Sequence, residues 1–60
     1  MKKCFETVIA GFPIVLEVEN LEFQVTYGLQ VHKGLSYSDA AHRLGCCILH
    51  ALACEGKLDP

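Results

Sequence analysis

The sequence has few positive charges. Its 60 residues include five Lys and Arg against seven Asp and Glu, which gives a net charge of −2. Proteins that bind nucleic acid usually present a basic patch to the phosphate backbone. The basic residues here are scattered along the chain, at Lys2, Lys3, Lys33, Arg43 and Lys57. The charge pattern therefore argues against binding to a nucleic-acid backbone.

The sequence also lacks long hydrophobic runs. No stretch reaches the ~18 uninterrupted apolar residues that indicate a transmembrane helix. The basic start, residues 1–3, is followed by Glu6 rather than by the apolar segment of a signal peptide. The four cysteines have no spacing typical of a disulfide framework, and Cys46 and Cys47 are neighbours. We therefore expect reduced thiols in a cytoplasmic protein that does not cross a membrane.

The composition is 52% apolar and 20% charged, which is typical of a globular domain. A chain of this length buries only roughly 60% of the surface that it exposes when unfolded. We therefore expect a single domain over residues 1–60, marginally stable and partly covered by a second subunit.

Residues 21–31 alternate between apolar and polar side chains, a pattern typical of a long β-strand whose apolar residues, from Leu21 to Val31, all lie on one buried face. Two shorter strands are expected before it, over residues 4–10 and 14–18. Turns at Gly11-Phe12 and Glu19-Asn20 would place the apolar residues of all three strands on one face. The sequence therefore predicts a three-stranded antiparallel meander.

A helix is expected to follow, from about residue 37 to residue 55. Ser36 and Asp39 form a capping pattern, Ser38 is an alternative N-cap, and Gly56 is a natural helix stop. Apolar residues at helical spacing predict the buried stripe: Ala41, Leu44, Ile48 and Leu52. The predicted fold is α+β, with two layers in the order β-β-β-α and the helix packed on one face of the sheet.

The predicted register places three glutamates side by side on the outer face of the sheet. These are Glu6, Glu17 and Glu22, and the neighbouring row holds Val8, Val15 and Gln24. An acidic row beside an apolar row suits docking to a basic, partly apolar protein surface, such as a nucleic-acid-binding groove. The alternative is that the glutamates only solvate the open side of an antiparallel sheet.

Cys and His residues recur at every fourth position of the predicted helix and form a ridge opposite its apolar stripe. They are His42, Cys46, His50 and Cys54, with Cys47 and Ala53 also expected on the outward face. A helix exterior with so few charges favours contact with another surface. We therefore expect a homodimer whose interface contains His42, Cys46, His50, Ala53 and Cys54.

Zinc is an alternative use of the same ridge, because thiolate and imidazole are zinc ligands. One straight helix cannot close a tetrahedron with all four residues, whereas two antiparallel helices could each supply a pair. The homodimer without metal is the favoured interpretation, so no metal or other cofactor is expected.

The sequence assigns no catalytic residue. It has no nucleophile in a recognised catalytic context and no glycine-rich phosphate loop. A chain this short rarely encloses a substrate pocket. We therefore expect no enzymatic activity.

Two segments resemble known families. Residues 34–40, Gly-Leu-Ser-Tyr-Ser-Asp-Ala, resemble the G-x-S/T-x-x-E/D-A junction of HicB-type antitoxins, in which a small sheet precedes a long helix. That resemblance implies a protein that binds and silences an RNA-cleaving toxin.

Residues 38–45, followed by 55–58, are similar to the helix-turn-helix of excisionase and MerR-type proteins. In those proteins AA-x-x-LG opens the turn and EGKL ends the recognition helix. That similarity implies DNA binding, although the intervening segment is shorter here.

Small size, acidity and the lack of a catalytic pocket are similar to the inhibitors carried by phages and other mobile elements, including anti-CRISPR proteins. The sequence therefore predicts a small non-enzymatic protein-binding module. It would act as an inhibitor, or antitoxin-like blocker, of a nucleic-acid-handling protein with a basic surface. The alternative is a DNA-binding or metal-responsive regulator that uses the C-terminal helix.

Overall fold

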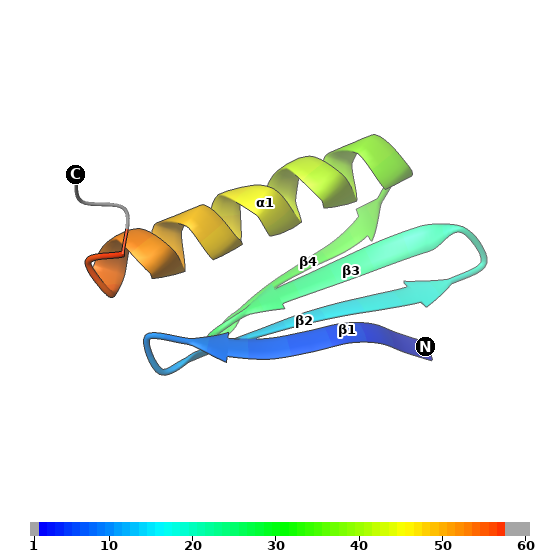
Figure 1. The fold of residues 1–60 in the computed structure, drawn as a ribbon. Coiled ribbons are helices and arrows are strands. Elements are labelled where there is room, and N and C mark those ends of the chain that lie inside the picture. Colours follow the sequence, from blue (N-terminus) through cyan, green and yellow to red (C-terminus); the bar gives the residue numbers. More distant parts are fainter. Residues whose placement is uncertain (1, 58–60) are drawn as a thin grey trace.

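The chain forms one antiparallel β-sheet and one C-terminal α-helix that lies across one face of that sheet (Figure 1). The structure is a computed structural model and describes residues 2–57. The α+β class and the C-terminal helix on one face are confirmed. The helix, α1, spans Tyr37–Cys54. The sheet has the strand order β1-β2-β3-β4, with β1 at Lys2–Ile9, β2 at Phe12–Glu19, β3 at Glu22–Tyr27 and β4 at Gln30–Leu35.

The prediction of three strands is wrong, because the segment 21–31 is not one strand. It contains β3, a tight turn at Gly28-Leu29 and the start of β4. Gly28 has a φ of 61°, the conformation that a two-residue hairpin turn needs at its first position. The turn pairs Tyr27 with Gln30 and thereby reverses the alternation. Val31 consequently lies on the open face, and not on the buried face as predicted.

The other two hairpin turns also differ from the prediction. They lie at Ala10-Gly11 and at Asn20-Leu21, and all four residues have positive φ, as a type I′ turn requires. Gly11 and Asn20 tolerate this conformation, which explains why the turns settle there. Each turn lies one residue away from its predicted position, and this difference shifts the pairing of the two strands that it joins by two residues. The same side chains stay on each face, but the residues that lie opposite one another are different.

Both ends of α1 are capped as the sequence predicts. The Ser36 hydroxyl accepts a hydrogen bond from the Asp39 N–H at 3.2 Å, so Ser36 is the N-cap. Gly56 has a φ of 77°, and its N–H donates to the Ala53 carbonyl at 3.0 Å. The Lys57 N–H donates to the Leu52 carbonyl, also at 3.0 Å, which completes a Schellman motif.

The core is small, and the side of α1 that faces it differs from the predicted stripe. Its buried apolar residues are Ile14, Val25, Ala40, Cys47 and Ala51. Leu44 packs against this core, as predicted, whereas Ala41 is exposed. The placement of Cys47 on the outward face is also wrong, because this residue is buried. Small side chains on the inner side of α1 let the helix lie close to the sheet.

Within residues 2–57, no helix is long and apolar enough to cross a membrane.

Candidate protein-binding surfaces

The face of the sheet opposite α1 is uncovered (Figure 1). The strand register places a group of largely apolar side chains on this face. Val15 on β2 lies opposite Thr26 on β3, which in turn lies opposite Val31 on β4. On the other side, Val8 lies opposite Pro13. Val8 is 65% exposed and Val31 is 48% exposed. We call these five residues the open-face patch: Val8, Pro13, Val15, Thr26 and Val31.

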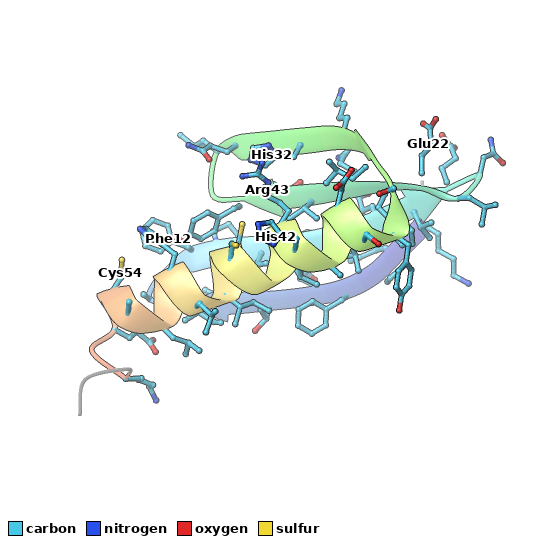
Figure 2. The ribbon with its side chains drawn as sticks, turned by 90° about the horizontal axis from the view of Figure 1, so that it is seen from above. Phe12, Glu22, His32, His42, Arg43 and Cys54 are labelled. Carbon is cyan, nitrogen blue, oxygen red and sulfur yellow. The ribbon has the colours of Figure 1, made fainter. Side chains whose placement is uncertain are left out.

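The three predicted glutamates share this face through strand alternation, but they do not form a row. The two-residue register shifts place Glu6 opposite Val15. Glu22 lies opposite Glu19, next to the β2–β3 turn at one end of the sheet (Figure 2). The predicted acidic row of Glu6, Glu17 and Glu22 is therefore wrong, and the three carboxylates are spread over the open face.

Polar partners hold two of these glutamates. The Glu6 carboxylate forms an ion pair with the Lys3 ammonium group at 3.2 Å, between two side chains that are about half exposed. Glu17 lies between Lys3 on β1 and Gln24 on β3, and accepts a hydrogen bond from Gln24 Nε2 at 3.3 Å. Exposed contacts of this kind contribute little to stability. They do fix the side chains that border the open-face patch.

The predicted Cys and His ridge on α1 divides into two parts. His42 Nε2 and Cys46 Sγ lie 3.6 Å apart on the exposed side of the helix (Figure 2). His50 instead turns toward the sheet, where its Nδ1 is 2.8 Å from the Tyr27 hydroxyl and the two rings meet edge to face with centroids 5.8 Å apart. Ala53 and Cys54 are exposed near the end of α1. The four residues of the predicted ridge are therefore not equivalent in the described helix, because His50 contacts the sheet whereas His42 and Cys46 contact each other.

The helix-turn-helix interpretation is not supported by the shape of α1. The motif needs a turn at Leu44-Gly45, but the helix continues through both residues without interruption. The described residues thus contain one helix where the motif requires two. Leu58, the last residue of the segment compared with the recognition helix, lies outside the described residues.

A shallow groove of about 170 Å³ lies between α1 and the sheet. Its lining is almost entirely apolar: Leu16, Phe23, Tyr37, Ala40, Ala41 and Leu44. Tyr37 contributes the one titratable side chain in this lining. Across residues 2–57, no group of three or more His, Cys, Asp or Glu residues has the arrangement of a metal site within one chain. The groove therefore offers apolar contact and brings no acid–base pair together.

Five surface residues were not among the predicted contacts: Pro13, Thr26 and Val31 on the open face, and Gly45 and Leu49 on α1. Val31 was assigned to the buried face, and the signal that corrects it is Gly28, a turn residue inside an otherwise alternating segment. Leu49 is 56% exposed on α1, and Gly45 adjoins the His42–Cys46 pair. The last two have helical spacing from His42 and could have been found from it.

Searches of protein-family models, curated proteins and solved structures found no match to this chain. The functional argument therefore depends on the chain's own surfaces.

Proposed function

We propose that this chain is a non-enzymatic protein-binding module that blocks a nucleic-acid-handling protein through the open face of its sheet. The observation that carries the proposal is the open-face patch, which spans all four strands, is apolar except for the Thr26 hydroxyl on β3, and is left uncovered by α1. Contiguous exposed apolar surface bordered by polar residues is typical of protein-interaction sites.

The charges around the patch indicate the chemistry of the partner. Four glutamates lie on the open face, namely Glu6, Glu17, Glu19 and Glu22, and two lysines, Lys3 and Lys33, share that face. A surface with this excess of carboxylates complements a basic protein surface, and such complementarity mainly accelerates and orients docking. Basic surfaces are common where proteins hold nucleic acid. The module would occupy that surface and exclude the nucleic acid.

The experiment compares capture of a host protein by the wild-type chain and by a patch variant, Val8→Lys with Val31→Lys. Both side chains are exposed and sit on edge strands, so the fold should tolerate the change. The matched control is Leu21→Lys with Leu29→Lys, which adds the same charge to exposed leucines at hairpin tips. We expect the patch variant to lose at least tenfold in affinity, with the control unchanged. Equal capture by both variants would dismiss the patch.

The charges are tested by Glu17→Lys with Glu22→Lys. If the partner is basic, association should slow at low salt and the salt dependence of the rate should diminish. An association rate that does not change would show that the partner surface is not basic.

A further inference from the structure

The outward side of α1 carries no charged residue. The buried residues Ala40, Cys47 and Ala51 define the side that faces the sheet. At about 100° per residue, seven residues lie within about 60° of the opposite direction. We call this set the outer helix face: Ser38, His42, Gly45, Cys46, Leu49, Leu52 and Ala53. Leu49 is the more exposed of the two leucines on this face, with 56% of its surface exposed.

Gly45 is the least expected residue of the outer helix face. It lies in the middle of α1, where glycine costs about 1 kcal/mol relative to alanine. Its φ is not positive, and a Cβ atom built on it would meet nothing within 4 Å. Nothing among residues 2–57 therefore requires glycine here. A missing side chain on an exposed helix does allow a second helix to approach closely.

The His42–Cys46 pair has the spacing of two metal ligands, and His42 neighbours Gly45 on the helix surface because the two residues are three positions apart. With Zn–S and Zn–N bonds of about 2.3 and 2.05 Å and an angle of about 109°, two ligands of a tetrahedral zinc ion lie about 3.5 Å apart, close to the distance found here. The distance between His42 Nε2 and Cys46 Sγ is 3.6 Å. Both side chains are exposed, so a cation can reach them without any change in the fold.

We propose that two copies of this chain join through their outer helix faces and share one zinc-class cation, held by His42 and Cys46 of each copy. One helix supplies two of the four ligands, and a two-fold axis through the cation supplies the same two residues from the second copy. The thiolates and imidazoles form a Cys₂His₂ set, which is typical of structural zinc sites. Gly45 lets the two helices approach, and Leu49 of each copy covers apolar surface beside the metal.

The first test measures metal content and mass together. The purified chain is saturated with zinc, freed of excess metal and examined by elemental analysis and light scattering. We expect one zinc ion per two chains, a mass twice the 6.6 kDa of one chain, and a return to monomer when a chelator is added. Substitution with Co²⁺ should give the visible absorption of a tetrahedral thiolate site. A monomer, a metal-free dimer, or one metal ion per chain would each overturn the proposal.

Variants identify the ligands. Cys46→Ser and His42→Ala should each lower zinc affinity by at least tenfold and yield monomers, whereas the control Cys54→Ser should retain metal and dimer. Gly45→Leu should yield a folded monomer, shown by an unchanged helical circular dichroism signal. If Cys46→Ser still binds zinc as a dimer, the His42–Cys46 contact is only a hydrogen bond within one helix, and the proposal fails.

Discussion

Leu21 is strained in a way that a single substitution should relieve. It occupies the second position of the β2–β3 turn with a φ of 65°, and its side chain is 88% exposed. The left-handed conformation costs a residue other than glycine roughly 1–2 kcal/mol. Leu21→Gly creates the favoured Asn-Gly turn, although glycine gains entropy in the unfolded chain. We expect a net stabilisation of about 0.5–1 kcal/mol in urea unfolding.

Leu29→Gly is the matched control, because Leu29 is also fully exposed in a hairpin turn but has no positive φ. It should leave stability unchanged or lower it. Equal effects of the two substitutions would mean that Leu21 is not strained.

Cys47 should be the least reactive of the four thiols. Burial raises the pKa of Cys47 above its usual value, the Arg43 guanidinium opposes that shift and Cys46 adds to it. The thiolate is the reactive form, and the other three cysteines are exposed. The protein is alkylated in the presence of a chelator, and mass spectrometry counts the modified cysteines over time. We expect three cysteines to react rapidly and the fourth slowly. Four alkylations at one rate would contradict the position of Cys47 in the core.

The same shift in the pKa of Cys47 makes the free energy of unfolding depend on pH. Because the folded state holds the Cys47 proton more tightly than the unfolded state, its contribution to stability is complete below the usual thiol pKa. That contribution is lost as the pH rises through the higher pKa of the folded protein. Cys47→Ala should therefore remove part of the alkaline loss of stability in urea unfolding.

At the scale of single elements, the start of α1 depends on one hydroxyl. Ser36→Ala removes the hydrogen bond to the Asp39 N–H and should lower the free energy of unfolding by about 1 kcal/mol. Ser38 lies within the first turn and provides the control. Ser38→Ala should leave stability unchanged or raise it slightly, because alanine favours the helix. The free energies are compared by urea unfolding, and equal losses would contradict the assignment of Ser36 as the N-cap.

Elements with a distinct local signal could be predicted from the sequence. The helix follows from its capping residues and from Gly56, all of which act within a few positions of the helix ends. The two strand faces follow from alternation, which survives any register shift of two residues. Alternation could not show the turn at Gly28-Leu29, because Leu29 is apolar and keeps the pattern although its side chain is completely exposed.

The surfaces were harder to predict than the elements. Which glutamates lie opposite one another depends on the turn residues, and the positive φ at Leu21 is not favoured by leucine itself. Tertiary packing also decides which side of α1 faces the sheet. Small residues, among them Ala40 and Cys47, face the sheet in place of the larger stripe residue Ile48. The separation of His50 from the rest of the ridge follows from its hydrogen bond to Tyr27.

For the whole molecule, stability depends on very few large side chains. Ile14 and Val25 are the largest fully buried residues in the described part of the chain. Ile14→Ala should cost about 2–5 kcal/mol, much of the stability of so small a domain. We expect a largely unfolded protein by circular dichroism, whereas Val8→Ala on the open face should change stability by less than ~0.5 kcal/mol. Similar losses for both would contradict the position of the core.

The measurement that tests the functional account most directly is a titration of the captured partner's nucleic-acid activity with the purified chain. A module that acts by occupying a surface must be present in stoichiometric amount. We predict that inhibition rises linearly and becomes complete near one chain per partner molecule. Complete inactivation at a small fraction of that ratio would indicate catalysis by this chain and would contradict the account.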